Sequence, residues 1–242
     1  MNSVLAQLKE RKSVRVFTDK PISEKETAAI LEAAVNAPTA GNQQLYTIIH
    51  VTDPQLKAQL AESCDHQPFI AQAPLVLVFC ADCRKWYQAF AAYGCQPRKP
   101  GVGDLMLAVS DTNIAAQNAV VAAHSLGIGS CYIGDIMENA EQQRKLLGLP
   151  SYVFPAAMLV FGFPTAEQLE RPKPPRSKMD HIVHENSYRD MDAKELQEML
   201  SVKTGVRSFE DWIKAFCNRK YNSDFSREMT RSVQVFLEDF NE

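Results

Sequence analysis

The sequence predicts a protein of the α/β or α+β class, built as one large domain with a helical extension. Runs with strand character alternate with helical patterns as far as Pro164, and beyond that residue the patterns are helical only. The chain has 242 residues, of which 45% are hydrophobic, and this is enough for one sizeable core. We therefore predict a core over residues 1–164 and an extension over residues 165–242 that packs on it.

Capping residues mark the first three helices. The pair Asn2-Ser3 can cap the first helix, and residues 13–17 then form a short extended segment. Ser23 and Glu26 have the spacing of a capping box that opens a second helix. Pro38 ends that helix, so residues 39–44 form a loop. Asp53, which precedes a proline, caps a third helix.

Strands are predicted where β-branched and other apolar residues gather. Residues 45–52, 130–134 and 153–163 have this composition, and Pro155 in the last run belongs near its start or at an edge. The run L-V-L-V-F-C at residues 75–80 is apolar on both faces, which predicts a strand inside the sheet. A polar loop is expected over residues 65–69.

The longest helical pattern covers residues 104–126 and ends before Gly127. Its stripe is rich in alanine, so another helix can approach it closely. The pattern fits either a buried central helix of a monomer or a helix at a subunit interface. Shorter helical patterns cover residues 138–147 and, in the extension, residues 192–201, 208–217 and 224–239.

Charge and motif content exclude several classes of protein. The net charge of −3 and the pI of about 6.0 give no reason to expect a nucleic acid or a membrane as partner. The sequence has no long apolar run and no signal-peptide pattern, so we expect a cytoplasmic protein with reduced cysteines. Cys80 and Cys83 have C-x-x-C spacing, but no second such pair and no histidine pair accompanies them, and no hydrolase motif occurs. Gly127 and Gly129 lie between a helix and a strand, the reverse of a dinucleotide fingerprint.

Two short stretches carry the candidate binding residues. In E-R-K-S-V-R-V, the side chains of Arg11, Ser13 and Arg15 share one face if the backbone is extended, and two guanidiniums with a hydroxyl suit a phosphate. The loop in A-P-T-A-G-N-Q-Q-L-Y can place amide and backbone groups against a planar polar ring. The two stretches together suggest a nucleotide-like cofactor, whereas the first motif alone is more often a solvated basic turn.

These stretches resemble the nitroreductase superfamily of FMN-dependent NAD(P)H oxidoreductases. The later segments P-K-P-P-R and H-E-N-S-Y-R are similar to those of its NADPH-dependent, oxygen-insensitive branch of nitroreductases and flavin reductases. The resemblance covers nearly the whole chain in order. It implies an α+β fold with a mixed sheet flanked by helices, and a homodimer that holds FMN at its interface and is embraced by the C-terminal extension. It also implies ping-pong hydride transfer through the flavin N5, with no catalytic side chain.

The resemblance further implies which residues hold the flavin and the substrates. Arg11, Ser13 and Arg15 match the residues that hold the FMN phosphate and ribityl chain, where Lys12 adds charge or is merely solvated. Arg171 and Lys173 match a K-P-R segment in reversed order, so which cation faces the flavin pyrimidine and which the phosphate stays open. The other implied flavin-binding residues are Pro38, Thr39, Ala40, Asn42, Gln44, Gln67, Tyr132, Ile133 and Gly134. Phe69 is expected to line the substrate site, and Lys203 and Arg207 are candidates for the NADPH 2′-phosphate or ordinary surface cations.

The leading hypothesis is an NADPH-dependent FMN oxidoreductase that reduces nitroaromatics, quinones or related acceptors. Within the same fold, the chain could instead be an NAD(P)H:flavin reductase that supplies reduced FMN to another enzyme. A flavin-binding protein without turnover and a basic binding module without flavin are further alternatives. The intact set of cations and amides argues against the last two.

Overall fold

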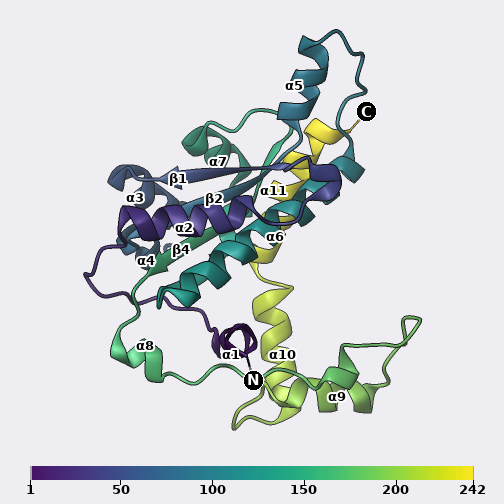
Figure 1. Cartoon of the computed structure of the whole chain (residues 1–242). Helices are drawn as coiled ribbons and strands as arrows, with labels where there is room; N and C mark the ends of the chain where they lie inside the picture. Colours follow the sequence, from purple (N-terminus) through teal and green to yellow (C-terminus); the bar gives the residue numbers. More distant parts are fainter. Residues whose placement is uncertain (1, 242) are drawn as a thin grey trace. The chain divides into compact units, whose positions relative to one another are not determined.

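The computed structural model describes residues 2–241, which form two compact units (Figure 1). The first, which we call the core unit, consists of the chain up to Arg171 and of the chain from Glu228 onward. The second, the helical unit, consists of Pro172–Arg227. Within the described residues, no helix is long and apolar enough to cross a membrane.

The core unit is organised around a four-stranded sheet in the order β1-β2-β4-β3. Neighbouring strands pair antiparallel in all three cases. Beside β3, Ser13 forms an isolated parallel bridge with Ser130, and Phe17 forms an antiparallel bridge with Pro164. The α+β class is therefore confirmed. The strands are β1 (Tyr46–Val51), β2 (Leu75–Asp82), β3 (Gly129–Ile133) and β4 (Val153–Gly162).

Pro155 lies near the start of β4, as predicted, although β4 is an inner strand. Strand β4 pairs with β3 only from Met158 onward, so Pro155 has no partner on that side. On the other side it is opposite Cys80, where the register with β2 shifts. The missing N–H of the proline is tolerated there because the ladder is already interrupted.

The predicted helices are present with small differences in their bounds. Asn2 caps α1 (Ser3–Glu10), Ser23 and Glu26 form the capping box of α2 (Glu24–Val35), and Asp53 caps α3 (Pro54–Ser63). Part of the expected loop at residues 65–69 is instead helical, because Pro68 starts the short helix α4 (Pro68–Gln72). The other helices are α5 (Arg84–Ala92), α6 (Val102–Ser125), α7 (Ala140–Leu147), α8 (Ala166–Glu170), α9 (Ala193–Ser201), α10 (Phe209–Lys220) and α11 (Asp224–Leu237).

Both faces of the sheet are covered, as the sequence of β2 predicted. Leu75, Leu77 and Phe79 pack with residues of α2 and α6 on one face, while the alternate residues of β2 pack on the other face with the end of α11. In Figure 1, α2 and α6 cross the first face side by side. The alanines of α6 pack against other elements of the same chain, since Ala115 and Ala119 are fully buried in this layer. Helix α6 is thus a central helix within the chain, while Met106, Leu107 and Ile114 on it are exposed.

Candidate functional site

Two glycines let the basic N-terminal segment lie along the sheet. The amide of Val14 donates to the carbonyl of Ser130 at 2.9 Å, which fixes the segment beside β3. Gly129 and Gly162 are register partners on β3 and β4. A Cβ at Gly129 would lie 2.6 Å from the Val14 side chain, and one at Gly162 would lie 2.5 Å from the Phe17 ring. Only glycine at these positions permits such close packing.

This docking gathers the predicted phosphate-binding residues Arg11, Ser13 and Arg15, which we call the N-terminal clamp. Burial raises the pKa of the Cys131 thiol, and the positive charges of Arg15 and Arg11 oppose that rise. Arg11 lies 5.8 Å from the ring centroid of Tyr132 and Arg15 lies 6.0 Å from that of Phe69. The clamp therefore forms a cationic surface with aromatic neighbours at the edge of the sheet.

Arg171 joins this surface from the end of α8. Its Nη2 donates to the carbonyl oxygen of Ser13, and its Nε is buried without a hydrogen-bond partner among the described residues. A buried guanidinium N–H without a partner is costly, so this site is suited to an added acceptor such as a phosphate or a ring carbonyl.

Lys12, which lies between two residues of the clamp, contacts the end of α8. Its Nζ donates to the carbonyl oxygen of Leu169 at 2.6 Å and also to that of Arg171. These carbonyls lie at the C-terminal end of α8, where they have no intrahelical partners. In this structure Lys12 caps α8, and its proposed role at a cofactor is untested.

Gln67 lies beside the end of β3. Its Nε2 donates to the carbonyl of Cys64 at 2.8 Å and to Asp135 Oδ2 at 3.1 Å. Asp135 belongs to the short 3₁₀ helix Gly134–Met137 that follows Ile133. Both amide protons of Gln67 thus have acceptors, which leaves its Oε1 as the atom available to a ligand. The structure brings together the clamp, Gln67, Phe69, Tyr132, Ile133, Gly134 and Arg171.

The loop of residues 39–44, which we call the amide loop, is held by Asp111 of α6. The buried carboxylate accepts hydrogen bonds from Thr39 Oγ1 at 2.5 Å, from the Ala40 amide at 3.0 Å and from the Leu45 amide at 3.4 Å. Thr39 Oγ1 in turn accepts from the Gln44 amide at 2.7 Å. One carboxylate therefore fixes both ends of the loop.

The conformation of the amide loop is unusual. Gly41, Asn42 and Gln44 have φ values of 56°, 56° and 51°, a region that non-glycine residues rarely adopt. The side chain of Gln44 donates to the carbonyl of Val35 at 3.1 Å and so caps α2, whereas Asn42 is exposed. Trp86 of α5 supports the loop by donating its Nε1 hydrogen to the Gln43 carbonyl at 2.7 Å. Strained backbone of this kind persists where surrounding contacts fix it.

The clamp and the amide loop lie at opposite edges of the sheet. The amide loop leads into β1, the clamp lies along β3, and β2 and β4 separate these strands. Three intervals between strands amount to about 14 Å across the sheet. Figure 1 shows the loop before β1 and the segment after α1 well apart in the core unit. Lys173, Lys203 and Arg207 belong to the helical unit, and their proposed roles are untested.

The sequence analysis did not identify the residues that hold the amide loop and Gln67 in place. Asp111 lies in the apolar stripe of α6, and an acidic residue at a buried helix position could have identified it as an anchor. Asp135 and Trp86 gave no such signal, because their contacts to Gln67 and Gln43 join elements far apart in the sequence.

Comparisons with known proteins point to one family. The model of the Nitroreductase family matches residues 8–163, more than half of the chain. The chain is 29% identical over 242 residues to the FMN reductase (NAD(P)H) of Bacillus subtilis, over 98% of this chain and 92% of that one. It is 36% identical over 195 residues to the oxygen-insensitive NADPH nitroreductase of Salmonella typhimurium, over 80% of this chain and 78% of that one. The structure of B. megaterium NfrA2 matches with a TM-score of 0.84 at 29% identity, over 99% of this chain and 98% of that one.

Proposed function

This chain belongs to the nitroreductase family, and from that premise we propose that it is an NAD(P)H-dependent FMN oxidoreductase. Its electron acceptor is a nitroaromatic, a quinone or a related small molecule. Relatives named as an NADPH nitroreductase and as an FMN reductase support this assignment.

The observation that carries the proposal is the cationic surface formed by the N-terminal clamp and Arg171. Arg11, Ser13 and Arg15 offer charge-assisted donors suited to a phosphate, and the buried Nε of Arg171 lacks an acceptor among the described residues. Tyr132 and Phe69 flank the guanidiniums with aromatic surface. This donor set fits FMN, which combines a phosphate with a flat ring that bears carbonyl groups.

The residues of the chain would bind and orient the cofactor. FMN, when bound, supplies the hydride and electron chemistry. The clamp would hold its phosphate, and Gln67 would present Oε1 to a donor because Asp135 and the Cys64 carbonyl occupy both of its amide protons. Arg171 would stabilise negative charge near its Nε, since a fixed cation favours the more negative form of a bound group. Lys173 remains the second candidate for that role.

A homodimer would bring the N-terminal clamp and the amide loop, which are separated within one chain, into the same site. Because the clamp and the amide loop lie at opposite edges of one sheet, we propose that the loop of one subunit reaches the flavin held by the clamp of its partner. The outward face of α6 supports this arrangement, since Met106, Leu107 and Ile114 are exposed there. Val4, Leu5 and Leu8 of α1 add further exposed apolar surface.

A second candidate function is that of a flavin reductase. The FMN reductase of Bacillus subtilis is similar to this chain over nearly its whole length, which favours this candidate. In that case free flavin would be the acceptor, and reduced flavin would be the product. The rates with free FMN and with a nitroaromatic at equal concentration distinguish the two functions.

An absorption spectrum of the purified protein tests the proposal. We expect flavin bands that bleach within seconds when NADPH is added without oxygen, and the same experiment with NADH ranks the two donors. Bands that persist with both donors would leave a flavin-binding protein without this activity. A protein that shows no bands, even after incubation with FMN, would contradict the assignment.

A further inference from the structure

The side chain of Lys12 contacts a different element from the residues of the N-terminal clamp on either side of it. In an extended segment, successive side chains point to opposite sides, so Lys12 is expected to point away from the face of the clamp. Val14, which shares its side by this alternation, is buried against Gly129. The contacts of Lys12 agree with the expectation, because its Nζ donates to the carbonyl oxygens of Leu169 and Arg171 at the end of α8.

The contacts between α8 and the clamp segment run in both directions. Lys12 donates to the carbonyl of Arg171, and the Nη2 of Arg171 donates to the carbonyl of Ser13, the next residue along the chain. The buried side chain of Gln168 adds a third contact, since its Oε1 accepts from the amide of Arg15 at 3.3 Å. Lys12 therefore fixes the main chain of Arg171, while Ser13 fixes its side chain.

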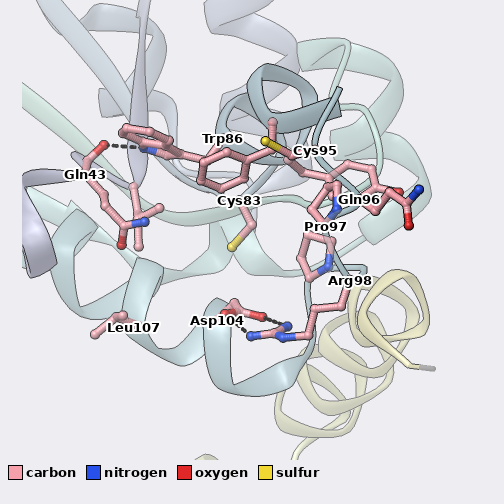
Figure 2. Close-up of a pocket in the computed structure, with 13 residues that line it drawn as sticks. Gln43, Cys83, Trp86, Cys95, Gln96, Pro97, Arg98, Asp104 and Leu107 are labelled. Carbon is pink, nitrogen blue, oxygen red and sulfur yellow. Dashed lines mark hydrogen bonds and ion pairs between the residues drawn. The ribbon is translucent and has the colours of Figure 1, made fainter. Parts of the chain in front are cut away.

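The cations of the core unit are held in two ways. Arg98 is paired with a carboxylate, and Figure 2 shows it facing Asp104 at N–O distances of 2.5 and 2.9 Å. Lys12 and Arg171 donate to carbonyl oxygens instead, and neither forms an ion pair within the part of the chain that the structure describes. A carbonyl group is neutral, so it fixes the direction of a cation without cancelling its charge. The positive charge at the end of α8 is therefore available to an anion.

Helix α8 needs support from outside, because it has only five residues. A helix of this length has little stability of its own. Arg171 is its C-cap residue, and the helical unit begins at the next residue. An ammonium group that binds the last carbonyls interacts favourably with the C-terminal end of a helix. Lys12 supplies this group, and the position of Arg171 depends on it.

We propose that Lys12 is a positioning residue for the flavin site, which acts through Arg171 and does not itself bind the cofactor. The inference rests on the proposed function, because that function gives Arg171 the task of holding a negatively charged group. The Nε of Arg171 is buried and has no hydrogen-bond acceptor among the described residues. By holding the end of α8, Lys12 keeps this N–H in the direction in which an anion can accept it.

A double-mutant cycle distinguishes a positioning residue from a direct ligand. A lysine that binds the phosphate contributes to affinity whether or not Arg171 is present, whereas a lysine that acts through Arg171 contributes only while Arg171 is there. The proteins are the full-length parent, Lys12→Met, Arg171→Met and the double variant, each freed of flavin. The probe is FMN, whose dissociation constant is measured by fluorescence titration.

We expect Lys12→Met to raise the dissociation constant of FMN about tenfold or more, as for one lost charge-assisted hydrogen bond. In the Arg171→Met protein the same change should have at most about a twofold effect, which is the usual error of additivity. An equal loss in both proteins would make Lys12 a direct ligand and overturn the proposal. Unchanged affinity after Lys12→Met would overturn it as well.

Two further variants are matched to Lys12→Met. Lys12→Arg keeps a cationic donor for the carbonyls of α8, so it should recover most of the affinity that Lys12→Met loses. Lys25→Met removes an exposed lysine of α2 and should leave the affinity for FMN unchanged. Together they separate the loss of the contact with α8 from the loss of one positive charge on the protein.

Hydrogen exchange in the flavin-free protein separates failure of this inference from failure of the proposed function. The amides of Leu169 and Arg171 donate to the carbonyls of Thr165 and Glu167 at 3.1 and 3.0 Å. In Lys12→Met we expect these amides to exchange about tenfold faster or more. A parent that binds no FMN would lack the proposed function, while faster exchange in the variant would still assign Lys12 to the support of Arg171. Equal exchange rates would overturn the inference, even in a protein whose flavin bleaches with NADPH.

Discussion

At the scale of single residues, the position of the clamp depends on the glycines that lie beneath it. The arginines supply the charge, but Gly129 and Gly162 supply the space in which Val14 and Phe17 lie. A methyl group at either glycine would enter the volume of a side chain that is packed there. The position of the clamp therefore depends on Gly129 and Gly162, which have no side chain to fill this space.

Gly129→Ala tests this dependence. The added methyl would lie 2.6 Å from Val14, so the basic segment must shift, and we expect a loss of about 1–3 kcal/mol in unfolding free energy with weaker FMN binding. Urea unfolding and fluorescence titration with FMN measure the two effects. Gly103→Ala adds the same methyl in open space and is the control. Equal FMN affinity in both variants would show that the segment does not need this glycine.

Glu138 gives the core unit a pH-dependent stability. Its side chain is buried, and its Oε1 has no hydrogen-bond partner among the described residues. Burial, followed by repulsion from Asp135, Asp65 and Glu228, raises its pKa from the ordinary 4.5 to about 7. The folded protein therefore holds this proton more tightly than the unfolded chain does. Its contribution to stability is fully present below about pH 4.5 and is lost as the pH rises to about 7.

Glu138→Gln should remove this dependence. We expect the variant to be more stable than the parent at pH 8, by on the order of 2–3 kcal/mol, and to differ less from it at pH 5. Urea unfolding at both pH values measures the difference. Glu32→Gln makes the same change on the exposed surface of α2 and should leave the pH profile of the parent unchanged. A parent whose stability rises between these pH values would contradict the account.

At the scale of elements, helix α6 connects the core to the site. One face of it packs its alanines against α2 and the sheet, and Asp111 in the same helix holds the amide loop in its strained conformation. A rigid helix can position a loop more precisely than the loop can position itself. The geometry of the amide loop thus depends on the packing of α6.

Asp111→Asn tests the anchor. The amide has one acceptor oxygen and a donor in place of the second oxygen, so it cannot accept from Thr39, Ala40 and Leu45 together. We expect a loss of about 1–3 kcal/mol in unfolding free energy and weaker FMN binding. Asp53→Asn is the control, because asparagine caps a helix as well as aspartate does. Unchanged FMN affinity in the Asp111 variant would separate the loop from the flavin.

At the scale of the whole molecule, our proposal assembles the flavin site from two copies of the chain. The clamp and the amide loop lie at opposite edges of the sheet, and the outward face of α6 carries exposed apolar residues. Association would cover this face and bring the two groups together at once. Flavin binding and subunit association should therefore depend on each other.

Ile114→Glu tests this coupling. Ile114 is an exposed apolar residue of α6, and a charge there would be costly to bury at an interface. We expect a smaller particle by light scattering and, in the same preparation, at least tenfold weaker FMN binding. Val35→Glu places the same charge at an exposed apolar position of α2 and should leave both measurements unchanged. A monomer that binds FMN as tightly as the parent would contradict assembly of the site from two subunits.

Local signals in the sequence were sufficient for most of the fold. The capping box at Ser23, the cap at Asp53, the all-apolar run of β2 and the stop at Gly127 each depend on neighbours a few residues away, and each is present as predicted. The clamp and the loop were also visible, because their chemistry lies in contiguous residues. Helix α4 was missed because a polar segment that contains proline fits both a loop and the start of a helix.

Only the tertiary structure decided where these pieces lie. Lys12 caps α8, Asp111 anchors the amide loop and Gly129 makes room for Val14. Each of these contacts joins residues that are far apart in the chain. The order of the strands, which places the clamp and the loop at opposite edges, also arises from long-range pairing. The sequence by itself determined the chemistry and the elements, since propensity and capping act over one or two turns. Burial and packing act across the fold, and they determined which groups meet.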